Sequence, residues 1–239
     1  MKLSLVIPCY NEAKNLPLLV PHCGAVAAAK PGVEIVLVDN GSGDNTQAVL
    51  GELLPQYPGC RSVKVDVNQG YGFGILSGLR AATGDVLAWT HADMQTDPKD
   101  VLKGLDLFEK SPQPERLFVK GRRFGRPFAD VVFTAGMGFF ETVLLAQPLW
   151  DINAQPTLFH RKFFETWDDA PNDFSLDLFA YYSAKHAGLD VRRFPVRFGE
   201  RAHGVSHWNV NWAAKVKFIR RTMDYSFELR RRLSARRTG

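Results

Sequence analysis

Residues 34–46 read EIVLVDNGSGDNT, and this stretch decides the fold. It joins an apolar run of the right length for a buried strand, Glu34–Val38, to a dense cluster of turn residues that begins at Asp39. Two other segments have the same form: Leu3–Ile7 runs into PCYNE, and Asp85–Thr90 runs into HADMQTDP. Three buried strands that each end in polar residues predict a parallel sheet whose ligands bind beyond the carboxyl ends of the strands.

Segments of helical composition lie between these strands, and one further strand is expected at Ser62–Val67. Strands and helices therefore alternate over about 110 residues, which predicts an α/β fold with a mostly parallel sheet covered by helices. The expected helices are Asn15–Lys30, Asp44 to about Leu54, Gly70–Ala82 and Pro98–Lys110.

The second half of the chain is less regular. We expect a catalytic domain over residues 1–208 and a basic helical tail over 209–239, because no internal repeat or low-complexity linker is present. The expected segments of this half are a basic loop at Lys120–Pro127, a buried helix at Phe128–Ala146, an irregular or short β segment at Asp151–Phe159, a helix at Phe174–Ala187, a strand at Val191–Phe198 and a long helix from Asn209 to about Ala235.

Composition excludes several classes of protein. The chain has 239 residues, of which 45% are apolar and 23% charged, close to globular averages and unlike disordered, collagen-like or coiled-coil chains. No continuous apolar run reaches about 18 residues, so no membrane-spanning helix is expected. The first apolar run is too short for the core of a signal peptide, which predicts a cytoplasmic location. Three cysteines without C-x-x-C spacing predict neither a disulfide framework nor a zinc site.

Positive charge is concentrated at the C-terminus. From Lys215 onward there are nine Lys or Arg residues and two acids, a balance of +7, so the rest of the chain carries −2 of the total of +5. The basicity belongs to the tail, which predicts a peripheral, salt-sensitive contact between residues 209–239 and an anionic membrane on its inner face. Packing of the tail's apolar stripe on the catalytic domain is the alternative interpretation, and it is favoured for the stretch before Tyr225, whereas the arginine clusters beyond it favour the membrane.

Two acidic side chains follow buried strands. Asp39 can accept hydrogen bonds from a nucleobase or ribose, and it can equally cap its own turn. Asp93, with Gln95 beside it, offers hard oxygen ligands that suit Mg²⁺ or Mn²⁺ carrying a diphosphate. Helix capping is the alternative for Asp93, although Asp97 is better placed for that role.

The glycine-rich stretch NQGYGFG, which contains Gly70, is similar to a phosphate cradle. It does not match G-x-G-x-x-G, because Ile75 stands where the third glycine belongs, and it follows the third strand instead of the first. The sequence also has neither G-x-x-x-x-G-K-[ST] nor G-x-S-x-G, which argues against a P-loop NTPase and an α/β-hydrolase.

Taken together and in order, the segments SLVIPCYNEAKNL, EIVLVDNGSGDNT, NQGYGFGILSGLRAATGDVLAWTHADMQTDP and FGERAHGVSHWN resemble family 2 glycosyltransferases, and among them the branch similar to dolichol- and polyprenyl-phosphate mannose synthases. The resemblance extends from about Leu3 to Trp208. It implies a GT-A fold, with a nucleotide-binding sheet and an acceptor-side second half. It also implies inverting transfer of a sugar from a nucleotide sugar to a lipid phosphate or another acceptor.

The resemblance also implies roles for individual residues. A nucleoside would be held by Pro8, Tyr10, Glu12 and Asp39, and Gly70 would contribute to the nucleotide-sugar site. Asp93 and Gln95 would bind the metal and the diphosphate. Arg122 or Arg123 would face the sugar or an acceptor phosphate, and Arg201 and Ser206 would close over phosphates.

One departure from the family pattern concerns the metal. The family usually has Asp-x-Asp after the fourth strand, whereas this chain has His91-Ala92-Asp93. Histidine can ligate Mn²⁺, but it brings no negative charge and suits Mg²⁺ poorly. A metal site would then consist of Asp93, Gln95 and His91 with the diphosphate, or metal dependence would be weaker.

Asp173 and Asp177 are the candidate acids on the acceptor side. A hydroxyl acceptor needs a base to remove its proton, whereas a phosphate acceptor is already ionised. Asp173 can cap the helix that follows, which leaves Asp177 as the catalytic candidate; a solvated helix face is the alternative.

Two other functions remain open. The departure at His91 suggests a homologue that binds nucleotide sugars without turnover. A module that binds nucleic acid or another anion through the tail is the second, but it does not explain three polar strand ends and the tail has no recognised nucleic-acid motif, so no nucleic-acid partner is expected.

Overall fold

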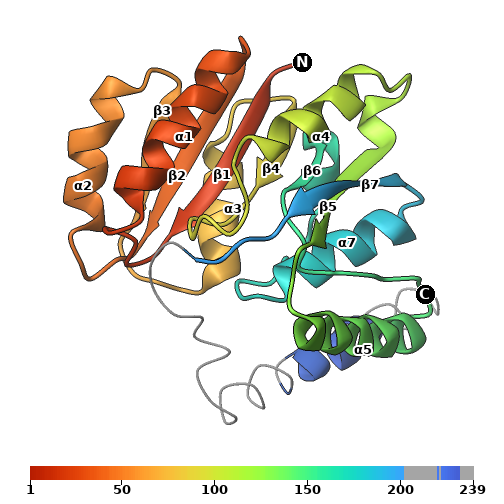
Figure 1. The fold of residues 1–239 in the computed structure, drawn as a ribbon. Helices are drawn as coiled ribbons and strands as arrows, with labels where there is room; N and C mark the ends of the chain where they lie inside the picture. The colour runs from red at the N-terminus through yellow and green to blue at the C-terminus, as the bar shows by residue number, and fades with distance from the viewer. Residues whose placement is uncertain (202–219, 221, 232–239) are drawn as a thin grey trace.

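The structure is a computed structural model that describes residues 1–201, 220 and 222–231. A seven-stranded sheet in the order β3-β2-β1-β4-β6-β5-β7 forms its centre (Figure 1). All neighbouring strands are parallel except where β6 pairs with β4 and β5. The strands are β1 (Leu3–Cys9), β2 (Val33–Asn40), β3 (Cys60–Val65), β4 (Val86–Trp89), β5 (Leu117–Phe124), β6 (Thr157–His160) and β7 (Asp190–Arg197).

Helices cover both faces of the sheet. Their bounds are α1 (Leu16–Ala29), α2 (Thr46–Leu53), α3 (Tyr71–Ala81), α4 (Asp100–Glu109), α5 (Phe128–Leu145), α6 (Arg161–Phe164) and α7 (Leu176–His186), with short 3-10 turns η1 (Leu54–Gln56) and η2 (Pro114–Arg116). Side chains of α1, α2 and α4 belong to one hydrophobic core, and those of α3, α6 and α7 belong to a second core on the other face.

Alternating side chains of each strand enter the two cores. Ile35 and Leu37 of β2 belong to the first core, and Val36 and Val38 to the second. Strands buried on both faces need continuous apolar runs, which is why the segments around residue 36 have no polar alternation. The mostly parallel α/β fold expected from the sequence is confirmed, and the expected helices and strands of the first 110 residues match within about two residues at each end, the usual scatter of such boundaries.

The predicted loop at Lys120–Pro127 is wrong, because most of it belongs to β5. This strand pairs with β7 along its whole length and with β6 over residues 118–120. Lys120 is completely buried in it, since its Nζ donates a hydrogen bond to Thr157 Oγ1 at 2.8 Å and lies 3.6 Å from Asp177 Oδ1. The basic composition indicated solvent exposure, but a distant carboxylate supplies the partner that a buried lysine needs.

The predicted burial of the helix that begins at Phe128 is also wrong. Helix α5 forms there, yet only Gly138, Glu141 and Leu145 are buried in it. Among the described residues α5 is also long and apolar enough to cross a membrane, by length and composition alone, whereas the sequence analysis expected no such helix.

Most of the predicted terminal helix, and the boundary at 208/209, lie outside the described residues. Residues 222–231, called the C-terminal segment below, are helical and pack against α5. Ser226 Oγ donates to Glu141 Oε1 at 2.7 Å, Phe227 meets Phe140 edge-on at 6.4 Å between ring centroids, and Leu229 is buried in the second core. These contacts lie beyond Tyr225, so the tail packs on the domain in a stretch for which the sequence favoured a membrane contact.

Candidate active site

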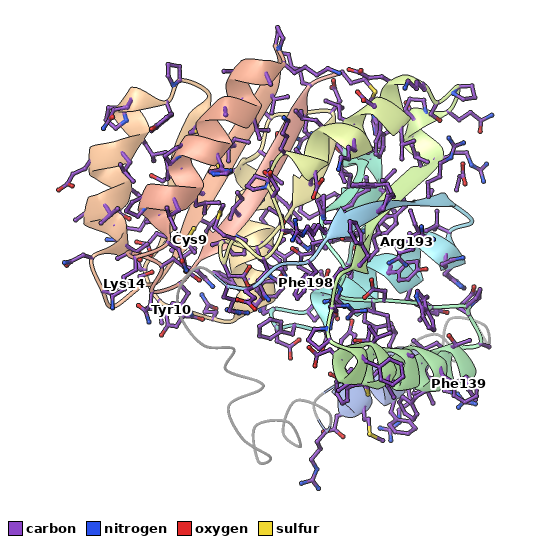
Figure 2. All side chains as sticks on the ribbon, in the orientation of Figure 1. Cys9, Tyr10, Lys14, Phe139, Arg193 and Phe198 are labelled. Carbon is purple, nitrogen blue, oxygen red and sulfur yellow. The ribbon has the colours of Figure 1, made fainter. Side chains whose placement is uncertain are left out.

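The carboxyl ends of the parallel strands meet at one edge of the sheet. Because β6 runs in the opposite direction, its amino end and the preceding cis peptide Gln155–Pro156 lie at this edge too. Figure 2 shows Cys9, Tyr10 and Phe198, which follow or end β1 and β7, along this edge.

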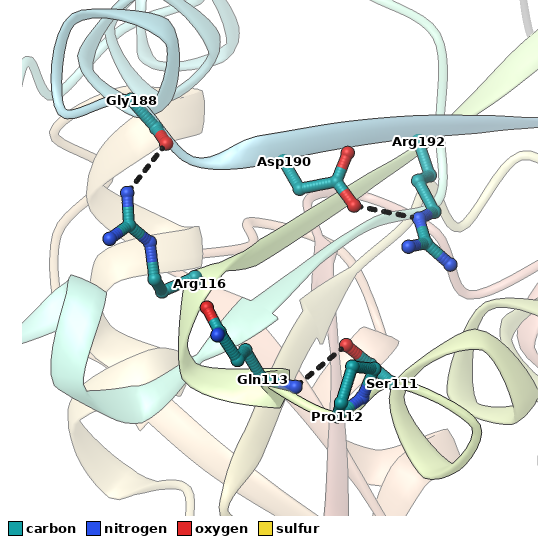
Figure 3. A pocket seen from close by; sticks show the side chains of 7 residues that line it. All are labelled: Ser111, Pro112, Gln113, Arg116, Gly188, Asp190 and Arg192. Atoms are coloured by element: carbon teal, nitrogen blue, oxygen red, sulfur yellow. Dashed lines mark hydrogen bonds and ion pairs between the residues drawn. The ribbon is translucent and has the colours of Figure 1, made fainter.

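A different pocket, of about 330 Å³, lies at the amino ends of β5 and β7 (Figure 3), and its Arg192 is paired with Asp190 at 2.8 Å. It is therefore at the opposite edge from the polar strand ends.

Asp39 is the penultimate residue of β2 and is almost completely buried. Its Oδ1 accepts a hydrogen bond from the backbone N of Ser42 at 3.1 Å, so it does cap the turn. Among the described residues no hydrogen-bond donor reaches its other oxygen. Gly41 has a φ of +70° and a Cβ there would lie 2.4 Å from the backbone N of Asn68, so this tight turn requires glycine.

The loop after β1 is tied to the same turn. The backbone N of Asn11 donates to Ser42 Oγ at 3.0 Å, and the backbone N of Glu12 donates to Thr46 Oγ1 at 2.9 Å. Burial raises the pKa of Glu12, against the opposing effect of the hydrogen bond from Asn15, and the charge of Asp93 raises it further. Pro8 lies within β1, and Tyr10 is about half exposed beside the turn.

Asp93 and Arg201 form an ion pair, 2.9 Å from Oδ2 to Nη2. Asp93 Oδ1 accepts from the backbone N of Gln95 at 3.1 Å. Gln95 holds Gly199 through two hydrogen bonds, from its Nε2 to Gly199 O and from Gly199 N to its own carbonyl. Gly199 and Arg201, at the start of the late basic motif, therefore contact the residues that follow β4.

The described residues at this edge fit a divalent metal only if a bound diphosphate supplies further oxygen ligands. No group of three or more His, Cys, Asp or Glu side chains among the described residues forms a ready metal site. One carboxylate oxygen of Asp93 faces a cation, Arg201, and the amide oxygen of Gln95 is a second hard donor. Burial lowers the pKa of His91, which favours the neutral imidazole that binds metals. Both carboxylate oxygens of Asp93 are engaged, by Gln95 N and by Arg201, so a metal here would depend largely on the oxygens of a bound diphosphate.

A buried polar cluster lies beside His91 and is formed by Tyr71, Gln155, Asp177 and Lys120. Tyr71 stacks on His91, and its hydroxyl accepts a 2.5 Å hydrogen bond from Gln155 Nε2. Gln155 Nε2 also lies 3.5 Å from Asp177 Oδ2, and Lys120 completes the cluster. Asp177 is thus on the candidate site's inner wall, almost completely buried, and not on a solvated helix face. Asp173 caps the turn before α7, because its Oδ1 accepts from Ser175 N at 2.8 Å.

Three arginines converge on the buried carboxylate of Asp151. Arg123 donates from Nε at 2.9 Å, and Arg126 and Arg193 lie within 3.6 and 3.7 Å. Burial opposes ionisation, but Arg123 and Arg126 outweigh it and hold the pKa of Asp151 below its usual value. Of these residues, the sequence pointed only to Arg123 as a candidate. It did not point to Asp151, Arg126, Arg193 or Gln155, because no local motif joins Asp151 to arginines about 30 positions away.

The remaining predicted residues have simpler positions. Arg122 is exposed at the carboxyl end of β5. Gly70 has both backbone groups engaged, its N–H by Asn68 Oδ1 and its carbonyl by Asn40 Nδ2, and a Cβ would lie 2.3 Å from Asn172 O. It therefore holds the loop before α3 in place. Ser206 lies outside the described residues.

Comparisons with known proteins agree with this geometry. The family model for "Glycosyl transferase family 2" matches residues 4–168. A polyprenol monophosphomannose synthase of Mycolicibacterium smegmatis is 31% identical over 215 residues, covering 84% of this chain and 79% of that protein. An undecaprenyl-phosphate 4-deoxy-4-formamido-L-arabinose transferase of Sodalis glossinidius is 40% identical over 106 residues, which is 42% of this chain and only 31% of that protein.

Solved structures support the fold. Glucosyl-3-phosphoglycerate synthase of Mycobacterium tuberculosis, in complex with Mn²⁺, UDP and phosphoglyceric acid, superposes with a TM-score of 0.72 at 18% identity, over 96% of this chain and 78% of that one. A mannosyltransferase of Pyrobaculum calidifontis in complex with GDP-Man and Mn²⁺ gives a TM-score of 0.64 at 21% identity, over 84% and 57%. Both are GT-A glycosyltransferases, so the expected GT-A fold is confirmed.

Proposed function

The chain belongs to glycosyl transferase family 2, and from that premise we propose that it transfers a sugar from a nucleotide-sugar donor to a polyprenyl phosphate, with inversion at the anomeric carbon. The names of the relatives support the acceptor class. The observation that carries the proposal is the ion pair of Asp93 and Arg201. It joins the acidic end of β4 to the late basic motif at the point where a departing diphosphate needs both.

On the donor side, Asp39 accepts hydrogen bonds from the base or ribose, while Tyr10 offers its exposed ring to the base. Pro8 and Glu12 support this wall from β1 and the loop after it. The rigid turn at Gly41 favours this role, because binding groups that are already in place lose little entropy when the ligand arrives.

On the phosphate side, Arg201 stabilises the negative charge that develops on the leaving group. Its planar guanidinium matches phosphate oxygens and pairs with Asp93 when no phosphate is present. Asp93, Gln95 and His91 would hold a divalent metal, which would add Lewis-acid stabilisation of the same charge.

On the acceptor side, the cluster of Arg123, Arg126 and Arg193 carries more positive charge than Asp151 neutralises. With Arg122 beside it, this cluster suits an acceptor phosphate, which is already ionised and attacks without a base. Asp177 is paired with Lys120 inside the wall, so we assign it to positioning Gln155 and Tyr71 and not to proton removal.

The test is a transfer assay with UDP-, GDP- and dTDP-sugars, Mn²⁺ or Mg²⁺, and a short-chain polyprenyl phosphate. We expect a lipid-linked sugar whose anomeric configuration is opposite to that of the donor. Asp93→Asn should lower turnover at least about tenfold, or about 1.4 kcal/mol of barrier, and His91→Ala should cost less.

Two results would contradict the proposal. Tight donor binding without transfer to any acceptor would favour a non-catalytic binding protein. Efficient transfer to a hydroxyl acceptor, with none to the lipid phosphate, would show that the acceptor class is wrong.

A further inference from the structure

Helix α5 presents an uninterrupted apolar stripe to the outside of the molecule. The stripe consists of Phe128, Val132, Gly136, Phe139 and Val143, in steps of three and four residues that keep them on one side of a helix. The four large side chains are 82%, 53%, 71% and 65% exposed. Figure 2 labels Phe139 on α5, at the end of the molecule away from Tyr10.

The opposite side of α5 is fixed to the protein. Gly138, Glu141 and Leu145 are buried there, and Glu141 accepts the hydrogen bond from Ser226 of the C-terminal segment. At the end of the helix, Thr142 Oγ1 accepts from the backbone N of Leu149 at 3.0 Å. A helix crossing a membrane would have to give up these contacts, whereas a helix lying flat on the membrane keeps them.

We propose that the outer stripe of α5 docks on the surface of an anionic lipid bilayer, with the helix axis parallel to the membrane plane. Helices that lie in the interface bury an apolar face at the boundary of headgroups and acyl chains, and basic residues nearby add attraction to anionic lipids. This inference rests on the proposed lipid-phosphate acceptor, because it supplies the surface from which that acceptor is reached.

Charge favours a bilayer over a second copy of the chain. The C-terminal segment on α5 is followed and preceded by strongly basic sequence, with a balance of +7 from Lys215 onward. Two such copies brought together would repel each other, whereas an anionic membrane attracts each basic residue close to it.

The position of α5 in the molecule also favours a bilayer as the partner of the apolar stripe. Helix α5 begins at Phe128, two residues after Arg126 of the arginine cluster around Asp151. Figure 1 shows α5 below α7, at the end of the molecule opposite α2 and β3. A membrane under α5 would therefore bring a lipid phosphate close to the cluster proposed to bind it.

The test uses the full chain and co-sedimentation with vesicles of phosphatidylcholine mixed with phosphatidylglycerol. Phe128→Ser/Phe139→Ser should lower the partition coefficient at least about fivefold, because it removes two aromatic anchors from the stripe. The matched control is Leu18→Ser/Val67→Ser, which removes two exposed apolar side chains outside α5 and should change partitioning less than about twofold. High salt should weaken binding of the unmodified chain.

The proposal is overturned if the unmodified chain does not bind the vesicles, or if both double variants bind equally well. It is also overturned if light scattering shows a dimer that only the α5 variant abolishes while no vesicle binding occurs. Thermal unfolding checks that the variants are folded. Titration with a nucleotide sugar in solution tests the donor site separately, so failure of the proposed function and failure of membrane docking give different results.

Discussion

At the scale of single residues, we propose that the two carboxylate oxygens of Asp39 have different roles, turn capping and ligand binding, which one substitution can separate. One carboxylate oxygen caps the turn through Ser42, and the other is left for a ligand. Asp39→Asn keeps an oxygen for the cap but removes the charge and one acceptor. We expect a folded variant whose nucleotide-sugar affinity falls by about ten- to a hundredfold, since hydrogen bonds to a charged group contribute about 1.5–3 kcal/mol. Isothermal titration measures this affinity, and an unchanged affinity would show that Asp39 does not bind the nucleotide sugar.

Lys120 is a second residue whose effect can be isolated. Burial lowers its pKa to about 8 although Asp177 works in the opposite direction. Lys120→Met leaves Asp177 buried without its cation, which should cost about 3 kcal/mol or more of unfolding free energy. Adding Asp177→Asn removes the uncompensated charge, so the double variant should recover most of that loss. Urea unfolding of Lys120→Met, Asp177→Asn and the double variant decides this, and simply additive losses would show that the two side chains do not stabilise each other.

At the scale of elements, α3 lies unusually close to the sheet because of Gly78. A Cβ at that position would lie 2.3 Å from Val6 Cγ1 and 2.8 Å from Val38 Cγ2. Gly78→Ala should therefore destabilise the fold by about 1–3 kcal/mol through overpacking. The control is Gly51→Ala in α2, where the Cβ meets no atom within 4 Å. There alanine should stabilise by up to about 1 kcal/mol, as in an open helix. Equal effects at both sites would mean that α3 can move away from the sheet.

We expect the contact between α5 and the C-terminal segment to depend on pH, through the buried carboxyl group of Glu141. Burial raises the pKa of Glu141 to about 7, against the opposing effect of the hydrogen bond from Ser226. The unfolded carboxyl ionises near 4.3, so the folded state holds an extra proton between these values and stability falls as pH rises from about 4.5 to 7. Glu141→Gln cannot ionise and keeps an acceptor for Ser226.

We expect Glu141→Gln to be more stable than the natural chain at pH 8, by at most about 3 kcal/mol, since each tenfold change in proton affinity is about 1.4 kcal/mol. The difference should shrink toward pH 5. Thermal melts across this range measure it, and a difference that does not vary with pH would mean that Glu141 stays ionised in the fold.

At the scale of the whole molecule, the proposed donor site links segments from both halves of the chain, since Arg201 from beyond β7 pairs with Asp93 from beyond β4. A ligand that spans them should stabilise the entire fold. At a hundredfold excess over Kd the gain is about 2.7 kcal/mol, which for a domain of this size raises Tm by about 5–10 °C. A screen of UDP, GDP and dTDP sugars with and without Mn²⁺ identifies the preferred base. No shift with any of them would contradict a nucleotide-sugar site.

The first half of the fold could be predicted because local signals suffice there. Continuous apolar runs such as Glu34–Val38 indicate strands buried on both faces, and the polar residues after them indicate the ligand edge. The second half depends on distant partners. Lys120 looked exposed because Asp177 lies 57 positions away in the sequence, and the apolar α5 looked buried because composition does not tell which surface covers a helix.

The same distinction holds for the site. Asp39 and Asp93 follow strands and could be located at one edge from the sequence alone. Asp151 and Gln155 reach that edge only because β6 runs in the opposite direction to its neighbours, and strand direction leaves no mark on local sequence.

That reversed strand has a consequence for how such enzymes diversify. β6 lies between β4 and β5, and it separates the strands that carry the proposed donor residues from β5 and β7. The Arg161 side chain, which follows β6, donates hydrogen bonds to the backbone carbonyls of Ala82 and Gly84. Recombination at the connection around Pro112 would exchange the proposed acceptor residues and keep the proposed donor residues of the first half, provided that the incoming gene segment encodes a strand with the same register against β4 and an arginine equivalent to Arg201. Lineages could then inherit a new acceptor preference without losing their nucleotide.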